Sequence, residues 1–390
     1  MLALRLARGS HPLVLLRRLS VAAAAAGTGF LLLSTVGHAA GHPSAAEESL
    51  VRLLWCAAPL AATAQFAVST ARTDPAARLQ RGMAAAGLGP LRLTLLATAS
   101  TALTCLLGVL LALLAFLRLR GDLGGPGGGA SLGIDSDLLG AGHPVPLGGA
   151  LLLLATVPLT AAAATAVALR PRNENGSREP AARLRTAPPS GLPWGIALAA
   201  AGLAVEAYAG PGRHAAGGLL PLPGRLIGSP PAVLAGWALS AFGLVLAGPG
   251  LVHLCGRLLC AGRPGALRLL SGRVLQEESH RLGRPLGVLC AVASAAYAAV
   301  KVYEASPTRP FGPLTAVGAA VVLACVTASA LTAALESRTA RAHTTAALRR
   351  LGASASVLHR AAALRGLALV VVLAPLTWTV AEMATLPLVH

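Results

Sequence analysis

Runs of about 20 apolar residues recur along the whole chain, and they constrain the fold more than any other feature. Each run is long enough to cross a bilayer core of about 30 Å as a helix. Hydrophobic residues make up 55% of the chain and charged residues 12%, which is about half the charged fraction of a soluble domain. The pattern therefore predicts a polytopic integral membrane protein.

Nine membrane spans are predicted, and each must be helical because lipid offers no partner to an unpaired backbone group. Alanine, glycine and leucine fill these runs, and small side chains let helices approach each other closely. The predicted fold class is all-α, with spans at about 21–40, 50–70, 92–116, 148–169, 193–210, 231–254, 286–303, 313–335 and 362–386.

The basic residues gather in alternate segments between the spans. With the N-terminus inside, the inner segments hold 25 of the 32 Lys and Arg residues. Such a bias over short loops predicts a cytoplasmic N-terminus and an external C-terminus. One lysine, Lys301, accompanies 31 arginines, which with the alanine content is typical of a high-G+C bacterial genome. The predicted location is therefore the bacterial plasma membrane.

A net charge of +18 does not predict a nucleic-acid partner here. That function needs a solvated basic face with stacking aromatic residues, whereas these arginines lie in short loops and aromatic residues make up 3% of the chain. Six cysteines form no C-x-x-C pair and mostly lie inside apolar runs, which favours buried thiols over metal ligands. No metal and no cofactor are predicted.

The order of spans indicates an internal duplication. A shift of about 265 residues aligns the first three spans with the last three and Gly87 with Gly352, so that 16–118 matches 281–383. The fourth span has no counterpart, and two spans lie between the repeats. The predicted divisions are a cytoplasmic N-terminal segment at 1–20, a first repeat at 21–169, a cytoplasmic linker at 170–192, two linking spans at 193–254, a cytoplasmic segment at 255–285 and a second repeat at 286–390.

Each repeat carries a basic, glycine-broken connector after its second span. In the first, Asp74 and Pro75 are typical of a helix start, Arg78 and Arg81 follow, and Gly87 can end the helix. In the second, residues 339–351 are predicted as helix, with Arg349 and Arg350 near its end, Gly352 as the stop and Ser354 as the next cap.

Three interpretations of these connectors stay open. A connector can be a positive-inside anchor, an interfacial helix on anionic lipid, or a coupling helix that docks on a cytoplasmic partner and transmits its motion to the adjoining spans. Its occurrence in both repeats favours the coupling helix, because a two-lobed partner needs two docking points. The residues expected to act in coupling are Arg78, Arg81, Gly87, Arg349, Arg350 and Gly352.

The segments "LALRLARGSHPLVLLRRLS", "RLQRGMAAAGLGPLRL" and "ALRRLGASASVLHRAAALRG" resemble the FtsX-like (MacB-type) ABC transporter permeases. In that family an arginine-rich segment with a G-A-s-x-x-x-l core follows the second span of each repeat. Gly352, Ala353, Ser354 and Leu358 match this core, and Gly87, Pro90 and Leu93 form a looser copy. The sequence departs from the family in its short first external loop and in the missing last span.

The resemblance implies the membrane-spanning permease subunit of an ABC-type transport or mechanotransmission system. Its partners would be a separate ABC ATP-binding subunit acting as a dimer, and the lipid bilayer. The chain itself lacks the G-x-x-x-x-G-K-[ST] motif, and it shows no pattern of catalytic residues, so it is not expected to be an enzyme. The alternative is a non-transporting membrane scaffold or regulatory protein.

Two carboxylates, Glu206 and Glu382, fall within predicted spans. An intramembrane carboxylate is a functional candidate by default. Both lie toward the outer ends of their helices, which favours snorkelling of their side chains to the interface.

Overall fold

The computed structural model describes residues 12–42, 44, 46–73, 90–121, 146–170, 191–208, 220–222, 226–229, 231–263, 265–304 and 313–389. Within them, nine helices are long and apolar enough to cross a membrane. This confirms the predicted all-α, multi-pass membrane fold. The candidate spans are Leu15–Gly41, Ser49–Arg72, Thr94–Arg120, Gly148–Leu169, Gly191–Tyr208, Val233–Cys260, Ala266–Lys301, Leu314–Ala340 and Ala355–Leu386.

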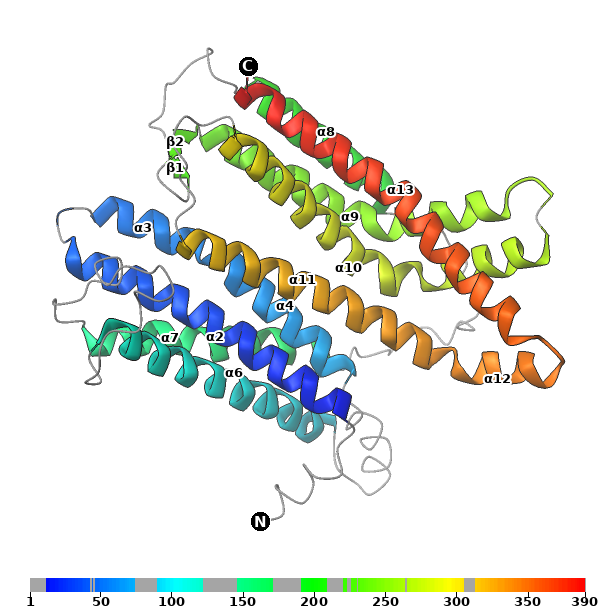
Figure 1. Ribbon diagram of the computed structural model, residues 1–390, viewed down its shortest axis with the longest axis horizontal. Coiled ribbons are helices and arrows are strands. Elements are labelled where there is room, and N and C mark those ends of the chain that lie inside the picture. The colour runs from blue at the N-terminus through cyan, green and yellow to red at the C-terminus, as the bar shows by residue number, and fades with distance from the viewer. Residues whose placement is uncertain are drawn as a thin grey trace. The chain divides into compact units, whose positions relative to one another are not determined.

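Figure 1 shows the helices and one short antiparallel hairpin, in which Leu222 pairs with Leu226. The elements are α2 (Pro12–Gly41), α3 (Ala46–Trp55), α4 (Ala57–Thr73), α6 (Pro90–Arg120), α7 (Leu147–Leu169), α8 (Gly191–Tyr208), β1 (Leu220–Leu222), β2 (Leu226–Ser229), α9 (Pro231–Cys260), α10 (Ala266–Glu304), α11 (Pro313–Ala340), α12 (Ala342–Arg350) and α13 (Ala355–Val389).

Proline marks the first residue of four long helices, α2, α6, α9 and α11. Proline suits that position because its missing N–H would have no intrahelical partner there and its φ is already helical. The candidate span Ser49–Arg72 contains both α3 and α4, which a turn at Cys56 separates. Pro59 lacks the N–H that would bond the carbonyl of Trp55, and this accounts for the break.

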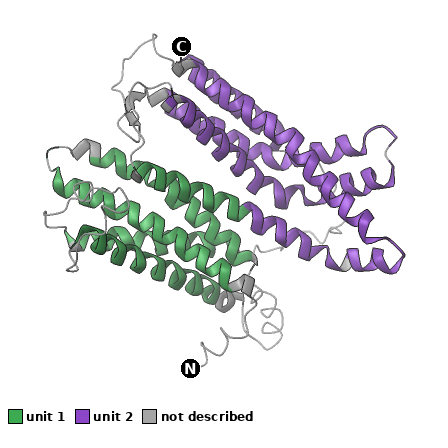
Figure 2. Cartoon of the chain, viewed as in Figure 1, with its two compact units in different colours: residues 1–173, 311–329 green, residues 174–310, 330–390 purple. Residues whose placement is uncertain are grey.

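Two compact units are defined by contacts within the chain (Figure 2). Unit 1 comprises residues 1–173 and 311–329, and unit 2 comprises residues 174–310 and 330–390. Helix α11 therefore contributes its first part to unit 1 and its last part to unit 2. In unit 1 α2 packs on α6, and in unit 2 α10 packs on α13, so the first and third helices of each predicted repeat are paired. The duplication and the predicted domain boundaries stay predictions.

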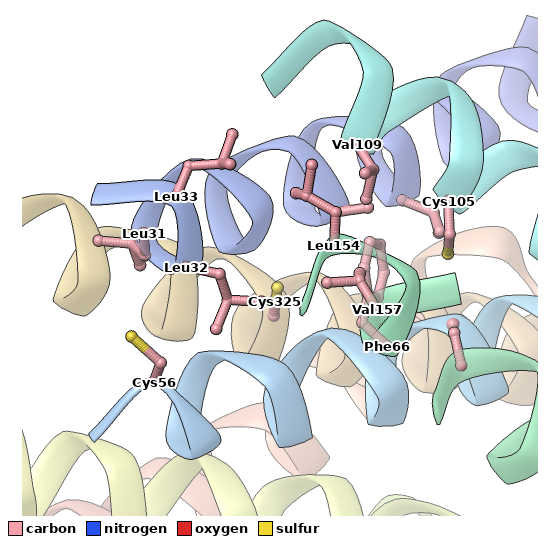
Figure 3. Packing of buried hydrophobic residues seen from close by; sticks show 14 of the residues in the cluster. Leu31, Leu32, Leu33, Cys56, Phe66, Cys105, Val109, Leu154, Val157 and Cys325 are labelled. Carbon is pink, nitrogen blue, oxygen red and sulfur yellow. The ribbon is translucent and has the colours of Figure 1, made fainter. Parts of the chain in front are cut away.

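Unit 1 has a core of medium-sized apolar side chains from α2, α4, α6, α7 and α11. Figure 3 shows Leu32, Phe66, Val157 and Cys325 converging between these helices. Two buried hydroxyls, Thr28 Oγ1 and Thr63 Oγ1, lie 2.8 Å apart within it. A hydrogen bond between two helices satisfies polar groups that lipid would leave unpaired. Five of the six cysteines of the chain are buried, as the sequence predicts.

The outward faces of the helices carry large apolar side chains. On α6 the exposed leucines are Leu95, Leu96, Leu103, Leu106, Leu107, Leu110, Leu111 and Leu114. A continuous apolar face of this kind would be a liability in water, whereas in a bilayer it meets acyl chains. The exposure pattern therefore agrees with membrane insertion independently of helix length.

Helix α9 is at the centre of unit 2. Its contacts with α8 and with α10 are more extensive than those between any other two helices of the unit. Glycines line both of these contacts. A Cβ added to Gly248 of α9 would meet the carbonyl oxygen of Gly283 in α10, and one added to Gly243 would meet the backbone of α8. The helices thus approach backbone to backbone, as small residues permit in membranes.

This packing yields a prediction for Gly248→Ala. The added methyl group has no room against Gly283, and overpacking of this kind costs about 1–3 kcal/mol of stability. The variant should unfold at a lower temperature than the unchanged protein in detergent. The matched control is Gly366→Ala in α13, where an added Cβ has no neighbour within 4 Å. Equal midpoints for the two variants would contradict the close approach of α9 and α10.

Candidate functional site

Of the two predicted connectors, the structure describes the second. Arg78, Arg81 and Gly87 of the first connector lie outside the described residues, so nothing structural is added for them. In the second connector, α12 (Ala342–Arg350) lies between the long helices α11 and α13.

The start of the connector helix differs from the sequence prediction. Residues 339–351 were expected to form one helix, but Thr339 and Ala340 belong to α11, and Arg341 forms a turn before α12 begins. The carbonyl of Arg341 accepts from the Thr345 N–H at 2.9 Å and from the Thr344 hydroxyl at 2.9 Å. Threonine hydroxyls compete with backbone N–H groups for backbone carbonyls. Here the hydroxyl of Thr344 stabilises the first turn of α12.

Gly352 ends α12, as the sequence predicts. Its φ is +94°, a conformation that L side chains rarely adopt. The Gly352 N–H donates to the carbonyl of Arg349 and the Ala353 N–H donates to the carbonyl of Leu348, both at 3.0 Å. This pair of bonds is a Schellman motif, which satisfies carbonyls that the helix would otherwise leave unbonded. Ser354 then precedes α13, and its hydroxyl lies 3.0 Å from that of Ser356.

An ion pair holds the turn between α11 and α12 against α10. Arg341 Nε lies 2.9 Å from Glu278 Oε1, with side chains 20% and 11% exposed. The same guanidinium donates from Nη2 to the Ser337 hydroxyl at 3.1 Å. Arg365 of α13 and Arg281 of α10 also lie close enough to Glu278 to attract its carboxylate. Glu278 of α10 therefore anchors the turn at Arg341 and attracts Arg365 of α13.

A second contact fixes α13 to α10 nearby. The buried hydroxyl of Ser271 donates to the carbonyl of Ala361 at 3.1 Å. The free surface of the connector lies at the other end of α12, where Arg349 and Arg350 are exposed and Leu351 is 84% exposed. The connector is thus held at one end and presents two cations and an apolar side chain at the other.

Glu206 does not snorkel. Its side chain is fully buried, at 0% exposure, between α8 and α9, and Ser240 Oγ lies 3.1 Å from Glu206 Oε1. The expectation from its position along the helix is wrong because Gly236 of α9 leaves space for the side chain: a Cβ there would meet Glu206 Cγ. A carboxylate buried between helices needs a hydrogen-bonding partner more than it needs proximity to the interface.

Glu382 has a different environment. Its Oε1 accepts from the Tyr297 hydroxyl at 2.8 Å and lies 3.9 Å from Lys301 Nζ. The side chain is 35% exposed. Glu206 and Glu382 therefore do not share one site: one is a buried carboxyl between α8 and α9, and the other belongs to a partly open cluster between α10 and α13.

Sequence reasoning missed Glu278, Arg341 and Tyr297 as contributors to these sites. Glu278 and Arg341 lie far apart along the chain and share no motif, so only packing brings them together. Tyr297 and Lys301 are one helical turn apart, and that spacing was a readable signal for a common face. No cluster of three or more His, Cys, Asp or Glu residues that could hold a metal ion occurs in the described part of the chain.

Comparison of the chain with protein-family models, with curated proteins and with solved structures finds no match.

The positive φ of Gly352 gives a prediction. It distinguishes a requirement for the left-handed backbone conformation from a requirement for a flexible residue. Gly352→Val places a β-branched side chain at φ +94°, and such a conformation costs about 1–2 kcal/mol. Gly352→Asn should cost less, because Asn tolerates positive φ better. The midpoint of thermal unfolding should be highest for the unchanged protein, lower for Gly352→Asn and lowest for Gly352→Val. Equal midpoints for Asn and Val would contradict the left-handed stop.

The anchor at Glu278 gives a second prediction. Glu278→Gln leaves Arg341 and Arg365 as partly buried cations without a neutralising charge, and loss of one partner from a buried pair costs about 3 kcal/mol. The neighbouring Glu277 is exposed, so Glu277→Gln makes the same charge change without this penalty. Denaturation of both variants in detergent measures the difference. A Glu277→Gln variant as unstable as Glu278→Gln would show that net charge, and not the pair, is responsible.

Proposed function

We propose that this chain is the membrane-spanning permease subunit of an ABC-type transport or mechanotransmission system, driven by a separate cytoplasmic ATPase. The observation that carries the proposal is the second connector. It is a short, capped helix between two long apolar helices, braced by Glu278 at its start and closed by Gly352 at its end. A plain topological anchor needs positive charge alone and has no need of this bracing.

The composition of α12 argues against an interfacial helix on lipid. Its sequence, AHTTAALRR, contains one large apolar residue, whereas interfacial helices bury a face of Trp, Phe or Leu in the acyl boundary. Leu351 is exposed beside Arg349 and Arg350. An apolar side chain flanked by arginines is a typical anchor for a protein partner, because such residues are enriched at interface centres.

Rigid attachment would let α12 transmit force. A push on α12 reaches α11 through the turn at Arg341 and reaches α13 through the backbone at Gly352. Because Glu278 binds this turn to α10, α10, α13 and the last part of α11 would respond together. The resemblance to FtsX-like permeases provides the second support. The chain is not itself expected to hydrolyse ATP, since its one lysine, Lys301, lies in no phosphate-binding motif.

The proposal places the protein in the bacterial plasma membrane, with a cytoplasmic N-terminus and with both connectors facing the cytoplasm. One permease chain with two connectors would engage one ATPase dimer. Affinity purification in mild detergent followed by mass spectrometry tests this arrangement. Recovery of an ABC ATP-binding subunit in stoichiometric amount is the expected result. Reproducible purification of the chain without any such subunit from its native host would contradict the proposal.

The docking surface itself is tested by charge reversal. Arg349→Glu combined with Arg350→Glu should reduce co-purification of the ATPase about tenfold or more, because truncating a central interface residue costs about 2 kcal/mol. The matched control is Arg268→Glu with Arg273→Glu on α10, which reverses two exposed arginines in the predicted cytoplasmic segment 255–285. Cysteine accessibility checks that the connector stays cytoplasmic in both variants. If the first variant keeps its orientation and binds the ATPase normally, the connector is only an anchor.

A further inference from the structure

The C-terminal ends of α10 and α13 carry four polar or aromatic residues that face each other. Tyr297 and Lys301 are one turn apart on α10, and Trp378 and Glu382 are one turn apart on α13. Residues four apart lie on the same face of a helix. The four residues are named here the Lys301 ladder.

The contacts of the ladder alternate between the two helices. Trp378 Nε1 donates to the Tyr297 hydroxyl at 3.3 Å, and that hydroxyl donates to Glu382 Oε1 at 2.8 Å. Lys301 Nζ lies 3.9 Å from Glu382 Oε1 and 5.7 Å from the centre of the Tyr297 ring. The ladder thus ends in a cation and an anion held close together by aromatic neighbours.

The charged end of the ladder is open. The side chains of Lys301 and Glu382 are 44% and 35% exposed. Their separation of 3.9 Å is longer than a hydrogen bond, so this contact leaves the N–H groups of the ammonium available to another acceptor. The carboxylate likewise retains accepting capacity, because the contacts with Tyr297 and Lys301 both fall on one of its oxygens, Oε1.

The surroundings of the ladder are apolar and exposed. Val300 of α10 and Met383 and Leu386 of α13 each expose about half of their surface, as does Trp378. Lys301 lies in the last turn of α10, and Glu382 lies in the C-terminal part of α13. Because the ends of membrane-spanning helices meet the lipid headgroups, we expect the charged pair near that level and the apolar residues beside acyl chains. Tryptophan is typical of this depth in a membrane.

We propose that the Lys301 ladder binds the headgroup of a zwitterionic phospholipid that carries a primary amine, in the leaflet opposite the second connector. Lys301 donates to the phosphate, Glu382 accepts from the ammonium, and Trp378, Met383 and Leu386 contact the glycerol and the upper acyl chain. This site goes beyond the proposed function and does not depend on an ATPase.

Charge complementarity selects this lipid over the other common headgroups. An anionic lipid such as phosphatidylglycerol would place its phosphate near Glu382 without giving that carboxylate a cation. Phosphatidylcholine has the positive charge but no N–H to donate, and a directed hydrogen bond to a charged acceptor contributes more than an undirected contact. The compact, rotatable ammonium of a lysine also suits a phosphate as a point charge, and this is the one lysine among 32 basic residues.

Native mass spectrometry of the full chain tests the proposal without any substitution. Protein released from detergent with equal amounts of phosphatidylethanolamine, phosphatidylcholine and phosphatidylglycerol should retain the first about fivefold more than either other lipid, the selectivity that one net hydrogen bond provides. Equal retention of phosphatidylcholine would overturn the recognition of the amine. Preferred retention of phosphatidylglycerol would overturn the pairing of Glu382 with a lipid cation.

Substitutions then assign the selectivity to the ladder. Glu382→Gln should remove most of the preference for phosphatidylethanolamine, because it removes the charged acceptor for the amine. Lys301→Met should instead lower the retention of all three lipids, because each carries the phosphate that Lys301 contacts, whereas Lys301→Arg, which keeps the charge, should retain most of the binding. Glu206→Gln is the matched control, because it changes a carboxyl of the same unit that is buried between α8 and α9. If Glu382→Gln keeps the full preference and Lys301→Met retains the three lipids as well as the unchanged protein does, the ladder only connects α10 to α13 and the proposed site is wrong.

Discussion

Lipid gives a peptide group no hydrogen-bond partner, and every other feature of this structure depends on that constraint. Each span must satisfy its own backbone, so the apolar runs become helices whatever their side chains are. The hydrophobic effect then has little to contribute to helix association, because acyl chains are as apolar as leucine. Association relies on close backbone contact, which glycine provides at Gly108 against Ala22 in unit 1 and at Gly248 against Gly283 in unit 2.

The same constraint decides where polar side chains are placed within the described helices. Thr28 meets Thr63 and Glu206 meets Ser240 in helix interfaces. Near the second connector, Glu278 meets Arg341. In each pair a group that lipid would leave unsatisfied is matched by a group from another helix, so these pairs also determine which helices are neighbours. The connector takes its rigidity from this principle, since its first turn is held by the partly buried carboxylate of α10.

The number of spans and the stop at Gly352 could be predicted because both follow from local rules. Apolar length predicts a span, and a glycine after a helical run predicts a left-handed cap. The start of α12 could not be placed, because a continuous helix and a helix with a turn at Arg341 have nearly the same local sequence preference. The prediction that Glu206 snorkels was wrong for a related reason. The position of a residue along a helix does not show whether a glycine of the neighbouring helix lies opposite its side chain. The resemblance to FtsX-like permeases has no counterpart among the comparisons, so the coupling role is a proposal supported by the geometry of the connector.

By itself, the sequence determined that this chain is a multi-pass helical membrane protein, because apolar length and scarce charge are properties of consecutive residues. It also determined the basic connector and its glycine, which are equally local. Only the tertiary structure decided that Glu278 anchors the turn at Arg341, that Glu206 is buried against Ser240, and that Lys301, Tyr297, Trp378 and Glu382 form one ladder. Each of these depends on which faces of two distant helices meet, and that is decided by the packing of small residues between helices over the whole unit.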